Sequence, residues 1–375
     1  MKKMNTGEVT DYQYVDDWKA RGKKVVGYFC SSFPREVIFA AGILPFRILG
    51  AVEPISEANN FLTPFACYLS RSSVDLALQG KLNFLDGAVM TYTCDVMGFL
   101  SHRWSQIKQF PADYFIYFLT RPLNLVDGSK ELFLGELTQF KESLERHFQV
   151  KVTDDSLAYA IRVYNKNREL LREIDRLKQD GLITGTEAAA TNFSSMVSPP
   201  EENNAVLTGF LAEARRRPSK NTGQRPRLFV SGAWLPNEEL FGMIEEAGAT
   251  VIADDLCVGQ KYFWGSIDED SSNPMEAIAG YYLAEGKPEC QCASMSTENR
   301  VQARLQNIIN KVEDMQVKGV VFAIARYCDL QLWDYKVMKK ALEEKGIKTI
   351  LISVEGTLKT DQVRNRLEAF LEIIS

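Results

Sequence analysis

Short apolar runs that alternate with helical patterns constrain the fold of this chain more than any other feature. Residues 23–29 (KKVVGYF) form a run rich in β-branched and aromatic residues, and a helical pattern begins at Pro34. Proline suits the first turn of a helix. Three more strand-like runs follow, at residues 46–51, 87–92 and 114–119. The first part of the chain therefore predicts a parallel sheet connected by helices.

A long helical pattern separates this first set of runs from a second set. Between Thr153 and Asp180 the apolar residues fall on one helical face, and two polar, proline-bearing stretches at 194–204 and 218–226 bracket a shorter helix. The second set of strand-like runs lies at residues 228–230, 250–253, 319–325 and 349–354, with helical patterns between them. We predict an N-terminal α/β domain at 1–150, a helical segment and linker at 151–225, and a C-terminal α/β domain at 226–375.

Composition narrows the class of protein. The 375 residues are 45% hydrophobic and 25% charged, which is enough for two packed domains, and the net charge of -5 argues against a nucleic-acid-binding surface. The sequence has no uncharged apolar stretch of the roughly 18 residues that a membrane span needs, and no signal-peptide pattern at its start. We therefore expect a cytoplasmic protein without a membrane span, whose seven cysteines stay reduced.

Five of the cysteines share a placement. Cys30, Cys94, Cys257 and Cys328 end or closely follow strand-like runs, and Cys67 opens a predicted helix. In an open α/β sheet, ligands bind outside the carboxyl ends of the strands. Thiols gathered there suggest an iron-sulfur cluster, whereas the alternative is that they are small buried hydrophobic residues.

Three of these cysteines suffice for a cluster. Cys94 and Cys328 follow strands of different predicted domains, and a cleft between the two sheets would bring such strand ends together, with Cys67 as a third thiolate. Three thiolates can hold a four-iron cluster and leave one iron open to substrate or water.

Other motifs do not predict a zinc site, a histidine-based catalytic site or a nucleotide-binding loop. Cys290 and Cys292 are too closely spaced for the common zinc motif, and the two histidines, His102 and His147, offer little material for imidazole ligation or a catalytic dyad. Neither a Walker-type loop nor a glycine-rich dinucleotide fingerprint follows a predicted strand.

Acid-base candidates are weak as well. Ser31 and Ser32 lie where a hydroxyl would approach a cluster-bound water or a thioester oxygen, with helix capping as the alternative role. Glu53 and Asp95 are the nearest acidic residues, with a cap or a surface carboxylate as the alternative. We assign no general base, and the catalytic residues stay unknown.

The chain resembles the family of 2-hydroxyacyl-CoA dehydratases and benzoyl-CoA reductases nearly from end to end. The stretches that carry the resemblance are GYFCSSFPREVIFAAGILPFRI from Gly27, FLTPFACYLSRSS from Phe61, GAVMTYTCDVMGFLSHRW from Gly87, VIADDLCVGQKYF from Val251 and GVVFAIARYCDLQLWDYKVMKKALEEKGI from Gly319. The resemblance implies two Rossmann-like domains with a helical portion. It also implies a 4Fe-4S cluster between the domains, on positions that match Cys67, Cys94 and Cys328.

The resemblance further implies partners and a reaction. Family members of about this length look like the smaller, beta-type or C-type subunit of a heterodimer with a homologous larger subunit. A separate ATP-dependent iron-sulfur activator protein delivers one electron at very low potential. With an acyl-CoA substrate, that electron would drive radical dehydration of a 2-hydroxyacyl thioester or dearomatisation of benzoyl-CoA.

Two alternatives stay open. Cys30, Cys257, Cys290 and Cys292 are thiols beyond the three needed, and the sequence around Cys30 and Cys257 also resembles relatives that hold a double-cubane cluster. Those relatives look like homodimeric reductases of small molecules. The second alternative is a non-catalytic electron-relay or scaffold subunit whose cluster never meets substrate.

Overall fold

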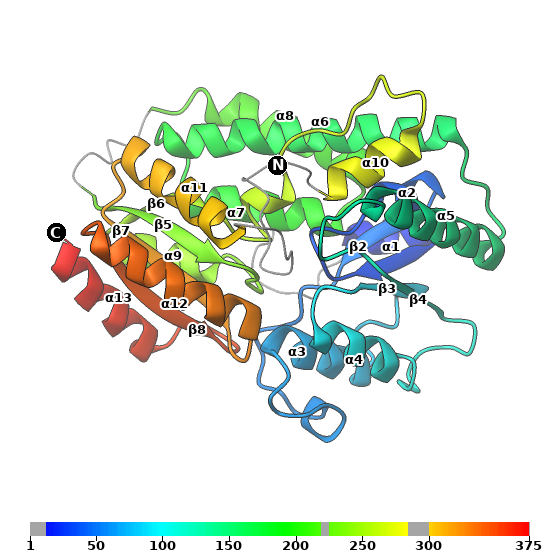
Figure 1. Cartoon of the computed structure of the whole chain (residues 1–375), viewed down its shortest axis with the longest axis horizontal. Helices are drawn as coiled ribbons and strands as arrows, with labels where there is room; N and C mark the ends of the chain where they lie inside the picture. Colours follow the sequence, from blue (N-terminus) through cyan, green and yellow to red (C-terminus); the bar gives the residue numbers. More distant parts are fainter. Residues whose placement is uncertain (1–12, 219–224, 284–299, 375) are drawn as a thin grey trace.

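Two parallel sheets form the framework of the protein. The structure is a computed structural model, and it describes residues 13–218, 225–283 and 300–374. Each sheet has four strands, in the order β2-β1-β3-β4 and β6-β5-β7-β8, and helices lie on both of them (Figure 1). Every pairing is parallel. The predicted α/β fold with two Rossmann-like domains is therefore confirmed.

Seven of the eight described strands coincide closely with the apolar runs of the sequence, whereas the strand predicted at 46–51 lies at Leu44–Arg47. Their bounds are β1 Val25–Tyr28, β2 Leu44–Arg47, β3 Gly87–Thr91, β4 Phe115–Leu119, β5 Arg227–Gly232, β6 Thr250–Asp254, β7 Gly319–Ala325 and β8 Lys348–Val354. Every residue of β1, β3 and β7 is buried, because helices cover both faces of these inner strands.

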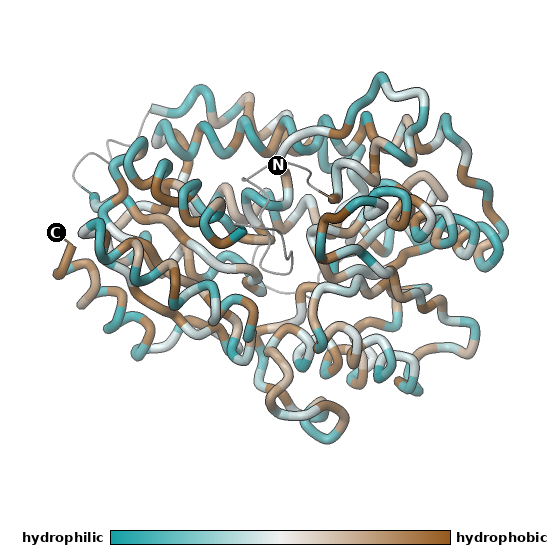
Figure 2. Tube along the Cα trace, in the orientation of Figure 1, coloured by the Kyte–Doolittle hydropathy of each residue, from teal (hydrophilic) through white to brown (hydrophobic). Residues whose placement is uncertain are grey.

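Helices make up most of the remaining structure. Their bounds are α1 Gln13–Ala20, α2 Arg35–Ala40, α3 Tyr68–Leu78, α4 Asp95–Trp104, α5 Ser129–Phe148, α6 Asp154–Gln179, α7 Gly185–Val197, α8 Pro200–Ala214, α9 Glu239–Glu246, α10 Pro274–Leu283, α11 Arg300–Asp314, α12 Asp329–Glu344 and α13 Asp361–Ile374. Along helices such as α5 and α12, Figure 2 shows hydrophobic and hydrophilic residues in alternation, as expected for helices with one buried face. None of the helices in the described ranges is long and apolar enough to cross a membrane.

The predicted long helix is α6, and the residues around it are more helical than expected. Thr153 caps α6 in a capping box with Ser156. The stretch 194–204, predicted as a polar connection, instead holds the end of α7 and the start of α8. Pro199 and Pro200 separate these two helices, because proline interrupts one helix and suits the first turn of the next. Both helices pack against α6.

The two sheets meet at a seam where loops after their strands are in contact. The guanidinium of Arg47, at the end of β2, donates to the carbonyl oxygen of Cys257 at 2.8 Å, and Trp234 donates to the carbonyl oxygen of Leu49 at 3.0 Å. Each bond joins a loop or strand end of one sheet to a loop of the other. The carboxyl ends of both sets of strands therefore face this seam, which we call the interdomain seam.

One helix reaches back across the seam. The helix α10 follows β6 of the second sheet, yet it packs against α5 and α6, as Figure 1 also shows. Its buried residues share a hydrophobic core with β1, β3 and β4 of the first sheet. The chain thus passes more than once between the two sheets, which adds packed contacts that link them.

A candidate iron-sulfur site at three helix starts

The three predicted cluster ligands occupy equivalent places in the fold. Cys67 is the N-cap residue of α3, Cys94 that of α4 and Cys328 that of α12, and none of these helices has a side chain that caps it. All three cysteines are partly buried thiols. A helix start directs unpaired backbone N–H groups and the positive end of the helix dipole at whatever lies there, which favours an anionic group.

The structure relates Cys67 to Cys94 through their helices, and it puts the main chain next to Cys67 in contact with the main chain before Cys328. A negative charge on Cys67 raises the pKa of Cys94, so the two thiols are close enough to interact, and α3 packs against α4. The N–H of Tyr68, next to Cys67, donates to the carbonyl oxygen of Arg326, two residues before Cys328, at 3.4 Å. Two cysteines of the first domain and one of the second therefore lie beside the interdomain seam.

Backbone groups already act on the sulfur of Cys94. Burial raises the pKa of this thiol from 9.0 to about 11 and the charge of Cys67 adds to the rise, whereas N–H groups of Met97 and Val96 in the first turn of α4 lower it. These first-turn N–H groups therefore favour the anionic form of the sulfur, which is the form that ligates iron.

The donor set, three thiols, has the chemistry that iron-sulfur clusters use. Across residues 13–218, 225–283 and 300–374, no three His, Cys, Asp or Glu side chains are grouped closely enough to share one ion. A four-iron cluster instead binds each thiolate at a different iron, so its ligands surround it from separate directions. Three cysteines on three helix starts match that requirement.

Cys30 and Cys257 lie on the same seam, joined through one buried arginine. Arg47 donates from Nε to the carbonyl oxygen of Phe29 at 3.2 Å, beside Cys30, and from Nη1 to that of Cys257 at 2.8 Å. The sulfur of Cys30 accepts from the N–H of Ser32 at 3.4 Å. Cys290 and Cys292 lie outside the described residues.

The acid-base candidates gain no support from their surroundings. Pro34 is the N-cap of α2 and no side chain caps that helix, so neither Ser31 nor Ser32 has the capping role considered as an alternative. Glu53 and Asp95 are exposed. No general base is assigned from them.

Sequence reasoning missed a buried network that supports the helix beginning at Cys328. Arg304, on α11, donates to Asp255 at 2.6 Å and to Gln331 and Asp334 of α12 at 3.1 Å each. Arg300 adds a bidentate pair with Asp334 at 2.6 and 2.7 Å. The one available signal was the pair Asp254-Asp255 at the end of a strand, where carboxylates are often functional or structural.

Comparison with known proteins identifies relatives along nearly the whole chain. The profile of the family described as 2-hydroxyglutaryl-CoA dehydratase, D-component, matches residues 30–374. The chain is 26% identical to the beta subunit of lactoyl-CoA dehydratase from Anaerotignum propionicum, with 96% of this chain and 94% of the relative covered. It is 25% identical to a benzoyl-CoA reductase subunit of Thauera aromatica, covering 98% and 95%.

Of two further comparisons, one supports the family and the other supports no conclusion. The chain is 24% identical to the beta subunit of (R)-2-hydroxyglutaryl-CoA dehydratase from Acidaminococcus fermentans, with 95% of this chain and 93% of the relative covered. Among solved structures, the SBP FpvC from Pseudomonas aeruginosa matches at 10% identity with a TM-score of 0.22, which supports no argument about fold. The family profile spans nearly the whole chain, and the protein therefore belongs to the 2-hydroxyglutaryl-CoA dehydratase D-component family.

Proposed function

We propose that this protein is the iron-sulfur subunit of an acyl-CoA dehydratase or reductase complex, with a 4Fe-4S cluster held by Cys67, Cys94 and Cys328. The observation that carries the proposal is the placement of these three thiols at the starts of α3, α4 and α12, from both domains, beside one seam. The names of the relatives, which are dehydratase and reductase subunits, support the same class of reaction.

The protein's own groups would bind and shield the cluster. When bound, the cluster supplies a low-potential electron for dehydration of a 2-hydroxyacyl-CoA or dearomatisation of benzoyl-CoA. The three partly buried cysteines would ligate it, and the first-turn N–H groups of α4 would favour the thiolate form of Cys94.

The proposed complex has two further proteins. The relatives are named as subunits, which supports a partner subunit, and we propose a homologous larger one. The ATP-dependent iron-sulfur activator is proposed from the family resemblance alone. Full dehydratase or reductase activity of this chain alone would contradict the need for them.

A variant of one ligand tests the site. Replacing Cys328 by serine removes one of three thiolates, so we expect anaerobically purified C328S to lose most of its iron and its activity in the complex. Far-ultraviolet circular dichroism should stay unchanged, because Cys328 is only partly buried. The matched control is Cys257→Ser, which should keep the iron if the cluster has three ligands. Unchanged iron content in C328S would contradict the assignment.

A double-cubane reductase is the second candidate. It is favoured by one observation, the joining of the main chain beside Cys30 to that of Cys257 through Arg47, which puts two further thiols on the seam. Iron counting separates the candidates, because a single cluster contributes about four irons per chain and a double cubane about eight.

The electron-relay alternative is tested separately. In the assembled complex, a change in the visible or electron paramagnetic resonance spectrum of the cluster on adding an acyl-CoA would contradict a pure relay. An unchanged spectrum with the correct partner and substrate present would favour it.

A further inference from the structure

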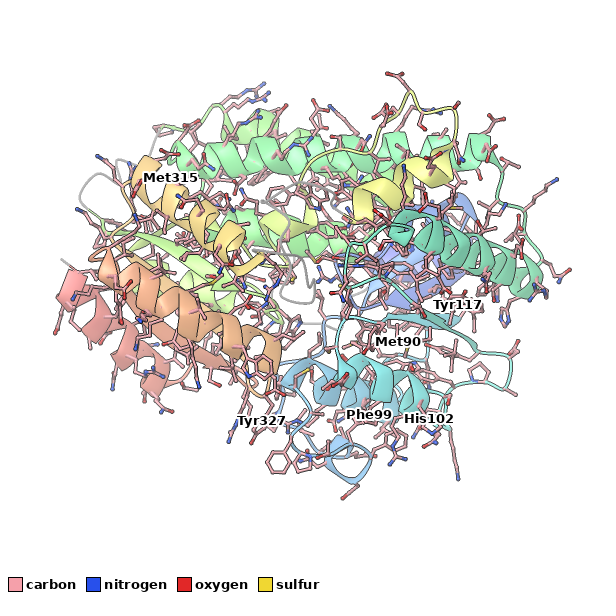
Figure 3. The ribbon with its side chains drawn as sticks, in the orientation of Figure 1. Met90, Phe99, His102, Tyr117, Met315 and Tyr327 are labelled. Carbon is pink, nitrogen blue, oxygen red and sulfur yellow. The ribbon has the colours of Figure 1, made fainter. Side chains whose placement is uncertain are left out.

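Four residues from both domains form a contact across the seam next to Cys67 and Cys328. Arg71 lies one helical turn after Cys67 on α3, Arg326 and Tyr327 directly precede Cys328, and Glu355 directly follows β8. We call Arg71, Arg326, Tyr327 and Glu355 the Glu355 clamp. Figure 3 labels Tyr327, at the junction of α12 and α3.

One carboxylate in the clamp holds guanidinium groups from both domains. Arg71 donates from Nη2 to Oε1 of Glu355 at 3.1 Å, and Arg326 donates from Nη1 to Oε2 of the same residue. Arg71 also donates from Nε to the carbonyl oxygen of Ala66 at 2.9 Å, directly before Cys67. A continuous set of hydrogen bonds therefore leads from the main chain beside Cys67 to the residue two positions before Cys328.

The backbone at Tyr327, within this contact, has an unusual conformation. Tyr327 has φ of 65°, in the left-handed region that residues other than glycine seldom adopt. Its ring lies 5.6 Å from that of Phe65 and 5.0 and 5.9 Å from the guanidinium carbons of Arg326 and Arg71. These contacts pack around a turn whose backbone conformation is unfavourable for tyrosine. The turn leads into α12, which has Cys328 at its start.

The two arms of the clamp differ in exposure. The side chain of Arg71 is 6% exposed, that of Glu355 34% and that of Arg326 51%. The arm through Arg71 is less screened by water and therefore the stronger one. Partial burial raises the pKa of Glu355, but its hydrogen bonds to Arg326 and Arg71 lower it overall, so the carboxylate is ionised at neutral pH.

We propose that the Glu355 clamp is a positioning unit that fixes the separation of Cys67 and Cys328 across the interdomain seam. The proposal rests on the proposed function, since these cysteines are its ligands. A four-iron cluster is rigid, so thiolates from two domains can bind it only if the domains keep one relative placement. Domains in one chain move relative to each other unless their interface restrains them. The clamp supplies such a restraint beside the two ligands.

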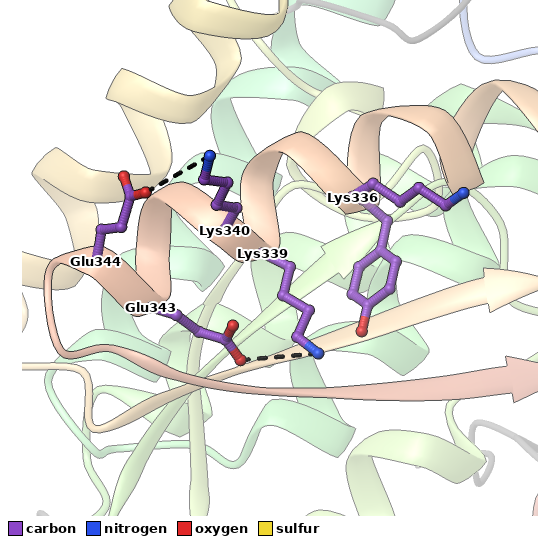
Figure 4. A pocket seen from close by; sticks show the side chains of 6 residues that line it. Lys336, Lys339, Lys340, Glu343 and Glu344 are labelled. Carbon is purple, nitrogen blue, oxygen red and sulfur yellow. Dashed lines mark ion pairs between the residues drawn. The ribbon is translucent and has the colours of Figure 1, made fainter.

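The experiment compares Glu355→Gln with a matched surface variant. Glu355→Gln keeps size and removes charge. Glu343→Gln does the same to a carboxylate on the outer face of α12 that pairs with Lys339 at 3.8 Å, within one helix (Figure 4). The first readout uses metal-free protein: the yield of a short thiol-to-thiol cross-link between Cys67 and Cys328, measured by peptide mass spectrometry. The second is the rate at which a chelator removes iron from the loaded protein.

The clamp predicts a specific pattern. We expect E355Q to lower the cross-link yield and to speed iron loss by about three- to tenfold, because the hydrogen bond that Arg71 donates across the seam loses its charge assistance. E343Q should match the wild type, and Glu355→Asp should recover part of the yield because it restores the charge. If E355Q does not fold, Arg326→Gln removes only the exposed arm and should give a smaller fall of the same kind.

Contrary outcomes are distinct. A cross-link yield in folded E355Q equal to that of the wild type would overturn the clamp, even if the unfolding midpoint fell, since that result indicates a merely structural residue. If the wild type binds iron and E355Q cross-links normally, the proposed function stands and the clamp proposal is wrong. If the wild type never binds iron and E355Q shows a lowered cross-link yield, the clamp proposal stands and the proposed function is wrong.

Discussion

Asp255 keeps a negative charge inside the protein because two cations surround it. Burial raises the pKa of this carboxyl, but Arg304 and Lys261 lower it from 3.8 to about 2. The Nε of Arg304 lies 2.6 Å from Oδ2 of Asp255, and Nζ of Lys261 lies 3.3 Å from the same oxygen. Through Arg304 this charge ties the end of β6 to α12, which begins at Cys328.

Removing the charge of Asp255 tests how much this one residue contributes to stability. Asp255→Asn leaves Lys261 buried without its carboxylate and Arg304 with only that of Asp334, so we expect a loss of about 3–5 kcal/mol in unfolding free energy at pH 7. The pKa is lower in the folded than in the unfolded protein. The carboxylate therefore stabilises fully above the unfolded value of 3.8, and the contribution is lost as pH falls towards about 2.

Urea unfolding at several pH values checks both statements. The difference between wild type and D255N should shrink below pH 3.8, where the wild-type carboxyl begins to lose its advantage. Asp113→Asn is the control, since Asp113 is exposed. Equal stability of the two variants at neutral pH would contradict a stabilising role for the buried charge.

At the scale of the element, α6 was the most predictable part of the fold and β2 the least. A strong helical period and the cap Thr153 mark α6, and its observed range of Asp154–Gln179 lies within the predicted limits. The strand predicted at 46–51 is instead Leu44–Arg47. The strand contains Pro45, which β2 accommodates because it is an edge strand, where the missing N–H of proline costs no sheet hydrogen bond.

The cap of α6 gives a prediction at this scale. Thr153→Ala removes the hydroxyl that accepts from the N–H of Ser156, so we expect a loss of about 0.5–2 kcal/mol, seen as a lower thermal midpoint. Thr208→Ala is the control, because Thr208 is exposed within α8, where alanine is the better helix former. A midpoint equal to that of T208A would count against the capping role.

At the scale of the whole molecule, polar contacts across the seam decide how the two sheets are placed. Arg47 is 2% exposed and hydrogen-bonds main-chain oxygens of both domains, at Phe29 and Cys257. Each hydrogen bond from a charged group contributes about 1.5–3 kcal/mol. A single buried side chain therefore contributes directly to the attachment between domains.

Arg47→Met keeps side-chain volume and removes both hydrogen bonds. We expect a stability loss of more than about 1.5 kcal/mol and a calorimetric unfolding curve that broadens or splits, because the domains become less coupled. Arg216→Met, an exposed arginine at the end of α8, should leave the curve unchanged. An R47M curve with the wild-type midpoint and width would show that Arg47 does not couple the domains.

Local sequence was enough to predict which segments are strands and where the cysteines stand relative to them. The run 319–325 is β7 with the same bounds, because a continuous apolar run fits a strand buried on both faces, and Cys94 and Cys328 therefore follow strands as expected. The folded structure was needed to show that the start of α3 meets Arg326, that Glu355 joins Arg71 to Arg326, and that Arg47 spans the seam. These contacts join residues far apart in the chain. They depend on how the two folded domains pack against each other, and local apolar periodicity does not specify that packing.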